Sequence, residues 1–212
     1  MTRRQVLQYL GAGAVGLALP WSGPVSALAA SDADERATAT IPGTDQTLPV
    51  IGMGTWQTFN VGRDPKLRRA RTKVLAAFFT AGGGMIDSSP MYGSSQAVVG
   101  DGLERLDGPE GLFAADKVWT RDGDATDAQV RRSRQHWGIE CFDLMQVHNL
   151  LAWRDHLPAL REMKAAGRVR YIGITTSHGR RHEELERIMR DEPIDFVQLT
   201  YNLTHRSVER RL

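Results

Sequence analysis

Four polar residues recur at nearly equal intervals along this chain, each at the end of a short apolar run: Asp87, Lys117, His148 and Thr175. The intervals are 30, 31 and 27 residues, which is about the length that one strand and its following helix need in a parallel barrel. The carboxyl ends of the strands in such a barrel form one face. The spacing therefore predicts that these four side chains meet on that face.

Apolar runs and helical stretches alternate from about residue 41 onward. The stretch 67–81, for example, places Val74, Leu75, Phe78 and Phe79 on one helical stripe. This order predicts an α/β fold of the (β/α)8 TIM-barrel type, with about six of the eight strand–helix units present. Strands are expected at 48–54, 85–86, 111–118, 142–147, 169–174 and 194–199, and helices at 67–81, 96–106, 127–136, 157–166, 182–190 and from 207.

An open, doubly wound parallel sheet is the alternative architecture. Such sheets commonly carry a Gly-x-Gly-x-x-Gly turn after the first strand, whereas the run 52–55, Gly-Met-Gly-Thr, lacks the third glycine and opens no helix. A complete barrel commonly has about 250 residues, and removing an expected leader of 29 residues leaves 183 of the 212. We therefore expect a barrel that is truncated at the C-terminus and exposes two strand edges.

Composition limits the possible partners. The chain is 41% hydrophobic and 25% charged, with a net charge of +2. Arg3 and Arg4 lie in a stretch without acidic residues, and the rest of the chain holds 25 basic and 25 acidic residues, which argues against nucleic acid as a partner. The lone Cys141 excludes an internal disulfide, and the six histidines show no metal-ligand spacing, so no metal site is expected.

The N-terminus resembles a targeting segment. Residues 2–8 contain the pair Arg3-Arg4, as in twin-arginine export signals, and an uncharged run rich in Gly and Ala follows over 9–19. This run is too short and too rich in glycine for a stable membrane span, and Ala-Leu-Ala at 27–29 fits a processing site. We expect a twin-arginine-type signal peptide at 1–29, a flexible linker at 30–40 and a barrel domain at 41–212. The twin-arginine machinery would then export the protein to the bacterial periplasm or the cell exterior.

The residues around Asp87 carry a more specific signal. Glycines 82–84 end a helical stretch, a short apolar strand follows, and a turn then places Tyr92 five residues beyond the carboxylate. The run 86–93, Ile-Asp-Ser-Ser-Pro-Met-Tyr-Gly, resembles the signature of the aldo-keto reductase family, in which the Asp and the Tyr belong to a catalytic tetrad. The resemblance extends from about residue 48 to residue 212.

The resemblance implies that a nicotinamide passes hydride to a carbonyl while a tyrosine supplies the proton. Tyr92 would be the general acid, and Lys117 as a neighbouring cation would lower the phenol pKa from its usual value of about 10. Asp87 would pair with the lysine, and a neutral His148 would hold the substrate oxygen. Taken singly, each has an ordinary interpretation: a turn cap, a loop aromatic, a solvated lysine and a structural histidine.

Two further family motifs concern the cofactor and the substrate pocket. Residues 52–56 resemble the first-strand motif, in which the backbone at Gly54 and Thr55 approaches the nicotinamide ribose, and Asp87 would also contribute to this site. Trp56 would line the substrate pocket together with Trp119, unless it packs in the core.

Residues 171–176 resemble the fifth-strand motif that binds the nicotinamide amide through a Ser-Asn pair. Here the pair is Thr175 and Thr176, so the side-chain amide at the second position is lost. Gln198 matches the sixth-strand residue that holds the same amide. A second departure is Gln96, where the family more often has Glu.

The leading interpretation is an exported NADP(H)-dependent oxidoreductase that reduces an aldehyde or ketone. The preference for NADPH over NADH follows family habit alone, and the later strands that hold the pyrophosphate and adenosine are not expected within these residues. A non-catalytic nucleotide-binding or regulatory barrel module, or an inactive truncated relic, stays open as an alternative. So does an unrelated barrel enzyme that uses Asp87 and His148 as an acid–base pair without nicotinamide.

Overall fold

The computed structural model describes residues 37–210, and these residues contain a parallel sheet of six strands. The strands follow one another across the sheet in chain order, and every neighbouring pair is parallel. Each connection must therefore cross over the sheet, which is the arrangement of a parallel β/α barrel. The strands are β3 (Met53–Gly54), β4 (Met85–Asp87), β5 (Phe113–Val118), β6 (Phe142–Val147), β7 (Val169–Thr175) and β8 (Phe196–Gln198).

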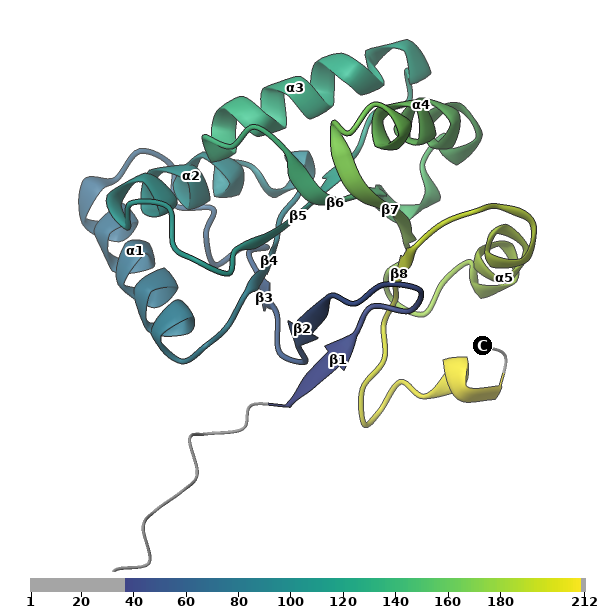
Figure 1. Ribbon diagram of the computed structural model, residues 1–212, viewed down its shortest axis with the longest axis horizontal. Helices are drawn as coiled ribbons and strands as arrows, with labels where there is room; N and C mark the ends of the chain where they lie inside the picture. The colour runs from purple at the N-terminus through teal and green to yellow at the C-terminus, as the bar shows by residue number, and fades with distance from the viewer. Residues whose placement is uncertain (1–36, 211–212) are drawn as a thin grey trace, which may run out of the picture. The chain divides into compact units, whose positions relative to one another are not determined.

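A helix follows each of the first five strands of this sheet, and Figure 1 shows the sheet curling with helices along its outer side. This confirms the expected incomplete (β/α)8 barrel with about six strand–helix units. Apart from the strand expected over 48–54, the expected positions also hold to within a few residues, and the largest shift among them is in the fourth helix, which starts four residues before the expected 157. The helices are α1 (Pro65–Thr80), α2 (Ser95–Arg105), α3 (Thr126–Trp137), α4 (Trp153–Ala165) and α5 (His182–Asp191).

Local sequence signals set the ends of the first helix. The Asp64 side chain accepts hydrogen bonds from the backbone N–H groups of Lys66 at 2.8 Å and Leu67 at 3.0 Å, and Pro65 occupies the first helical position. At the other end Gly82 adopts a positive φ of 77°, which a residue without a side chain adopts at low cost. The chain is thereby turned into β4.

Alternation along the strands divides the sheet into two faces. One set of residues packs with the helices in the larger core cluster and includes Ile86, Met145 and Ile172. The residues between them point to the barrel interior. There, Phe113 and Leu144 belong to a smaller apolar cluster, whereas the interior positions nearer the carboxyl ends are polar. The interior thus changes from apolar to polar along the strand direction.

A short antiparallel hairpin, β1 (Thr38–Thr40) with β2 (Thr47–Pro49), precedes the parallel sheet. The linker expected over 30–40 is therefore wrong for its described part, because Thr38–Thr40 pairs with Thr47–Pro49. The adjoining Ile41 is 5% exposed and belongs to the interior apolar cluster. Gln46 between the two strands accepts a hydrogen bond from the Tyr171 hydroxyl at 3.0 Å. The hairpin is held by these contacts against the interior of the sheet.

The single strand expected over 48–54 is also divided in two. Its first part forms β2 and pairs with β1, and its last part forms β3 and pairs with β4. Val50 and Ile51, which join the two strands, are 55% and 70% exposed. The apolar run at 48–54, which was predicted to form one strand, therefore contributes residues to two separate sheets.

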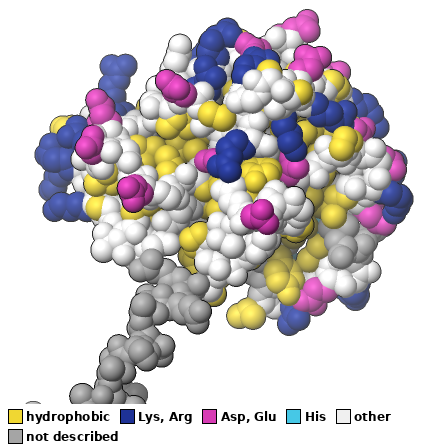
Figure 2. Space-filling view, in the orientation of Figure 1, with side chains coloured by type: hydrophobic (Ala, Val, Ile, Leu, Met, Phe, Trp, Pro, Cys, Tyr) yellow, Lys and Arg dark blue, Asp and Glu magenta, His cyan; other side chains and the backbone are white. Residues whose placement is uncertain are grey.

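The signal peptide expected at 1–29 and most of the expected linker lie outside the described residues. Within 37–210, no helix combines the length and the apolar character needed to cross a bilayer. On the face drawn in Figure 2, basic and acidic side chains are interspersed.

Candidate active site

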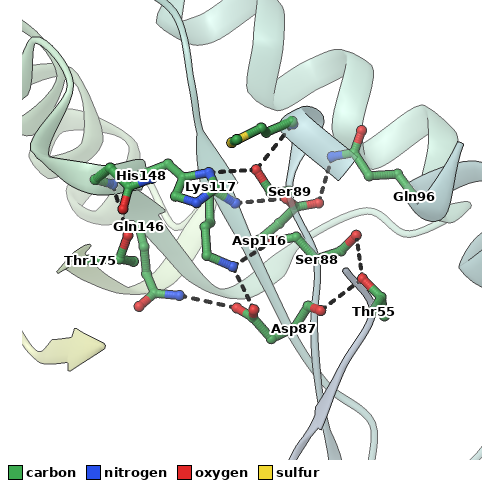
Figure 3. A network of polar contacts seen from close by, with 12 residues as sticks. Thr55, Asp87, Ser88, Ser89, Gln96, Asp116, Lys117, Gln146, His148 and Thr175 are labelled. Carbon is green, nitrogen blue, oxygen red and sulfur yellow. Dashed lines mark hydrogen bonds and ion pairs between the residues drawn. The ribbon is translucent and has the colours of Figure 1, made fainter. Parts of the chain in front are cut away.

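The side chains of Asp87 and Lys117 form an ion pair at the carboxyl ends of the adjacent strands β4 and β5. The Lys117 Nζ lies 2.5 Å from Asp87 Oδ2 and also donates to the backbone oxygen of Ser88 at 2.8 Å (Figure 3). The lysine side chain is 1% exposed and the aspartate side chain 14%. Charges removed from water in this way need close partners, and each of these residues supplies the partner of the other.

The Tyr92 ring lies against the Lys117 end of this pair. Tyr92 ends the short 3-10 helix Pro90–Tyr92, whose start is capped by Ser89: the Ser89 hydroxyl oxygen accepts from the Met91 backbone N–H at 3.1 Å. The Lys117 Nζ is 5.2 Å from the centre of the Tyr92 ring. The ammonium group therefore lies over the ring, a cation–π geometry.

His148 completes the group. It follows β6 and is buried, and its ring meets the Tyr92 ring edge to face, with centroids 5.6 Å apart and an interplanar angle of 88°. Its Nδ1 is 2.8 Å from the Ser89 hydroxyl. The four residues of the expected tetrad thus come together: Asp87, Lys117 and His148 from three consecutive strand ends, and Tyr92 from the turn after the first of them.

Burial, and after it the nearby Lys117 charge, together lower the pKa of His148 to about 3. The imidazole is therefore neutral at physiological pH. A neutral imidazole can donate one hydrogen bond and accept another. With Nδ1 beside the Ser89 hydroxyl, this ring can present a hydrogen-bonding nitrogen without adding charge to the site.

The electrostatics of Tyr92 differ from the expectation. Its pKa is raised, first by burial and then by the negative charges of Asp87 and Asp116, whereas we expected Lys117 to lower it. The reason is geometric, because the Lys117 ammonium lies over the ring and donates to Asp87 and Ser88. The phenol consequently stays protonated over the whole neutral range, the form required of a proton donor.

The motif residues Gly54 and Thr55 lie beside Asp87 at the edge strand β3. Thr55 is fully buried. Its hydroxyl can donate a hydrogen bond to the Asp87 carbonyl oxygen at 3.0 Å or to the Ser88 hydroxyl oxygen at 2.9 Å. This hydroxyl is therefore used in holding β3 to the β4 end. Gly54, by contrast, is exposed, and a Cβ added there would meet nothing within 4 Å. The space beside Gly54 is open to a ligand.

The expected amide-binding residues lie at the ends of β7 and β8. The Thr175 hydroxyl accepts from the Asn149 backbone N–H at 2.9 Å. Thr176 donates its backbone N–H to the Gln198 carbonyl at 2.9 Å, and its buried side-chain oxygen has no hydrogen-bond partner among the described residues. The Gln198 side chain is exposed. A buried hydroxyl without a partner is unfavourable by itself, so Thr176 fits a polar ligand group.

Trp56 and Trp119 are 54% and 41% exposed. Core packing of Trp56, the alternative to a place in the pocket wall, is therefore excluded. Trp119 follows β5 two residues after Lys117, and its backbone exchanges two hydrogen bonds with the Gln129 side chain, at 2.6 Å and 3.1 Å. Both indoles are available to contact a ligand.

Several polar residues that contact the four could not be recognised from the sequence motifs. Gln146 donates to Asp87 Oδ1 at 3.4 Å from the neighbouring strand. Ser88 and Ser89 supply the carbonyl and hydroxyl groups already described. Asp116 is fully buried on the opposite side of β5 from Lys117. Alternation would have pointed to Gln146, because it lies two residues before His148 and so shares the interior face of β6.

The fold and this site define a parallel β/α-barrel protein with a cluster of titratable side chains at the carboxyl ends of its strands. Residues 50–212 match the model of the aldo/keto reductase family, so the chain belongs to that family. The resemblance noted from the sequence is confirmed at this level.

Known proteins similar to this chain agree with the assignment. Methylglyoxal reductase YeaE of Escherichia coli (strain K12) is 27% identical over 171 residues, which cover 78% of this chain and 58% of that protein. The Neosartorya fischeri protein named probable NAD(P)H-dependent D-xylose reductase xyl1 is 28% identical over 121 residues, 54% of this chain and 35% of its own length. The chain thus spans about half the length of these relatives.

Among solved structures, the thermostable aldo-keto reductase Tm1743, crystallised with the inhibitor epalrestat, superposes with a TM-score of 0.69 at 25% identity. The match covers 82% of this chain and 66% of that one. The fold of the described residues is therefore that of the family.

Proposed function

We propose that this protein is an NADP(H)-dependent oxidoreductase that reduces an aldehyde or a ketone to an alcohol. The observation that carries the proposal is the placement of the Lys117 Nζ, 2.5 Å from the Asp87 carboxylate and 5.2 Å from the centre of the Tyr92 ring, with His148 against the same ring. Family membership supports it, as do relatives named as reductases of methylglyoxal and D-xylose.

The nicotinamide cofactor, when bound, supplies hydride to the carbonyl carbon. Tyr92 then donates its proton to the carbonyl oxygen as the alkoxide charge develops. Lys117 offers a positive charge beside that oxygen, and Asp87 keeps the lysine in place. His148, neutral at physiological pH, donates a hydrogen bond that orients the substrate oxygen toward the phenol.

The residues around the site fit a nicotinamide group. The open space beside Gly54 can admit the ribose, and the buried Thr176 hydroxyl without a partner can bind the carboxamide together with Gln198. The exposed Trp56 and Trp119 would form the apolar walls of the substrate pocket. Aromatic walls of this kind suit small carbonyl compounds with an apolar part.

The test combines cofactor binding with turnover. Addition of the 212-residue protein to NADPH should change nicotinamide fluorescence, and methylglyoxal or an aldose should then cause loss of NADPH absorbance. Tyr92→Phe should abolish this loss and leave binding intact. Tyr201→Phe is the matched control, because Tyr201 is 56% exposed and its hydroxyl bonds Glu209 at 2.6 Å. Binding without any turnover would instead indicate a non-catalytic module.

We also propose that the protein is exported by the twin-arginine route, on the strength of Arg3-Arg4 and the uncharged run that follows. These residues lie outside the described part of the chain. Replacing both arginines by lysine should leave the protein in the cytoplasmic fraction of a bacterial host, whereas the unchanged chain should reach the periplasm. Equal distribution of the two forms would contradict the proposal.

A further inference from the structure

A buried polar cluster lies on the side of β5 opposite the Lys117 side chain, the side that faces the helices (Figure 3). Its centre is Asp116, which is 0% exposed. Asp116 Oδ2 accepts from Gln96 Nε2 at 2.8 Å and from Trp137 Nε1 at 2.7 Å, and Oδ1 accepts from the Lys117 backbone N–H at 2.7 Å. Three N–H groups are the kind of environment that holds a carboxylate in a buried position.

The donors to this carboxylate are all uncharged. Burial of a carboxyl group that has no cation in contact with it is costly, and an apolar residue would satisfy packing between β5, α2 and α3. The position of Asp116 is informative, because it precedes Lys117 directly and one of its oxygens holds the Lys117 peptide.

We propose that Asp116 is a positioning residue for proton transfer at Tyr92: its carboxylate fixes the Lys117 peptide and holds a second negative charge behind the Asp87–Lys117 pair. The proposal rests on the proposed function and names a group that does not itself touch the substrate. Neither the four-residue site nor the sequence motifs include it.

The influence of Asp116 can reach the site in two ways. Adjacent residues on a strand point to opposite faces, so fixing the peptide between them fixes the direction of the Lys117 side chain toward Asp87. The negative charge of Asp116 also acts on the phenol, and it is among the causes that raise the pKa of Tyr92. Position thus acts on Lys117, and charge acts on Tyr92.

The pKa of the Asp116 carboxyl lies close to neutral pH. Burial and, to a smaller extent, the Asp87 charge raise this pKa to about 7, against the opposing effects of the Gln96 side chain, the Lys117 backbone N–H and the Lys117 charge. The other groups that face it, Gln96 and Trp137, do not titrate. His148 is neutral and Tyr92 protonated near pH 7, so a neutral midpoint at the site belongs to Asp116.

The side-chain amide of Gln96 supplies a hydrogen-bond donor to the Asp116 carboxylate. One hydrogen of its Nε2 goes to Asp116 and the other to the Ser133 hydroxyl at 2.8 Å. A glutamate at position 96 would bring a second carboxyl against Asp116 and force the two to share a proton. With Gln96, the carboxyl group among these contacts is that of Asp116 on β5, beside Lys117.

The first test is an NMR titration of the full chain from about pH 5 to pH 9, following the Lys117 backbone amide and the Tyr92 Cζ. Both resonances should shift with one midpoint near neutral pH in the unchanged protein. The shift should vanish in Asp116→Asn and persist in Ser133→Ala, which removes a hydrogen bond of the same cluster but keeps the carboxylate. A Lys117 amide that does not titrate, or that titrates equally in Asp116→Asn, would overturn the proposal.

Trp137→Phe is a second test variant, for use if the Asp116→Asn protein does not fold. It keeps the aromatic packing and the carboxylate but removes one donor, so the midpoint should move to higher pH. An unmoved midpoint in a folded Trp137→Phe protein would count against Asp116 as the titrating group.

The second test is kinetic. Asp116→Asn should lower kcat for carbonyl reduction by roughly tenfold to a hundredfold with little change in NADPH binding, and should remove the inflection near neutral pH. Ser133→Ala should keep both. Parallel losses in the two variants with unchanged pH profiles would reduce Asp116 to a structural role. If the unchanged protein reduces no carbonyl, the proposed function fails, whereas the NMR titration still decides whether Asp116 acts on Lys117 and Tyr92.

Discussion

The ammonium group of Lys117 is held at two points, by the carboxylate of Asp87 at 2.5 Å and by the carbonyl of Ser88 at 2.8 Å. These two acceptors belong to consecutive residues at the end of β4, whereas the lysine comes from β5. The ends of the two strands are therefore tied together by the same group that lies over Tyr92. Loss of the lysine should affect both activity and stability.

Lys117→Met should lower kcat for reduction by about a hundredfold or more and destabilise the fold by about 3 kcal/mol, since Asp87 would be left as a mostly buried charge without its partner. Kinetics with NADPH and urea unfolding measure the two effects. Lys164→Met is the control, because its pair with Asp195 at 2.7 Å is partly exposed; it should cost about 1 kcal/mol or less. Equal destabilisation by the two substitutions would contradict the interpretation.

His148 should make stability depend on pH with a definite sign. Its pKa is lowered to about 3 in the fold, against about 6.5 in an unfolded chain, so the unfolded chain binds the extra proton between these values. The contribution is complete above a pH of about 6.5 and is lost as the pH falls toward about 3. The stability difference between the unchanged protein and His148→Gln should therefore shrink from about pH 7 to about pH 4.5 in urea unfolding.

That comparison separates His148 from Asp116, whose effect has the opposite sign. The pKa of Asp116 is raised to about 7, so its contribution declines as the pH rises from about 4 to about 7. Asp116 is present in both proteins and its contribution cancels in the difference. A difference that grows on acidification would show that His148 is charged in the fold.

Gly54→Val should separate cofactor binding from folding. The added side chain meets no atom within 4 Å of its Cβ, and valine suits a strand, so the melting temperature should stay within a few degrees. NADPH affinity should fall by about tenfold or more, since the new side chain fills the space assigned to the ribose. Fluorescence titration and thermal melting measure the two, and an unchanged affinity would remove Gly54 from the cofactor site.

Thr176→Asn should increase NADPH affinity several-fold, because a side-chain amide offers a donor and an acceptor where the hydroxyl of Thr176 now lacks a partner. Thr176→Ala is the control and should change the free energy of unfolding by about 1 kcal/mol or less, since it removes no hydrogen bond between described residues. A weaker affinity in Thr176→Asn would show that the carboxamide lies elsewhere.

The convergence of Asp87, Lys117 and His148 could be predicted because it depends on the spacing of strand ends, and spacing is visible in a sequence. The position of Tyr92 followed from a short turn after Asp87 and is equally local. The pKa shift of Tyr92 could not be predicted, because its sign depends on how far each charge lies from the phenol and on what else Lys117 contacts.

The cluster around Asp116 was missed for a related reason. Asp116 looks like a second charge beside Lys117, and its partners Gln96 and Trp137 come from two different helices. Nothing in the local sequence shows that these three side chains meet. The hairpin at Thr38–Thr40 was missed because its stability comes from Ile41 and Gln46 contacting strands far along the chain.

The hydrogen bond from the Tyr171 hydroxyl to Gln46 joins residues 125 positions apart. Ribosomal synthesis makes the acceptor long before the donor, so this contact forms after most of the described chain has been made. Non-local contacts of this kind are slow to form, because the chain between the two residues must close first. Fluorescence or hydrogen exchange at this junction would therefore report when the N-terminal hairpin has docked against β7, a step that the export route proposed above would require before the folded chain crosses the membrane.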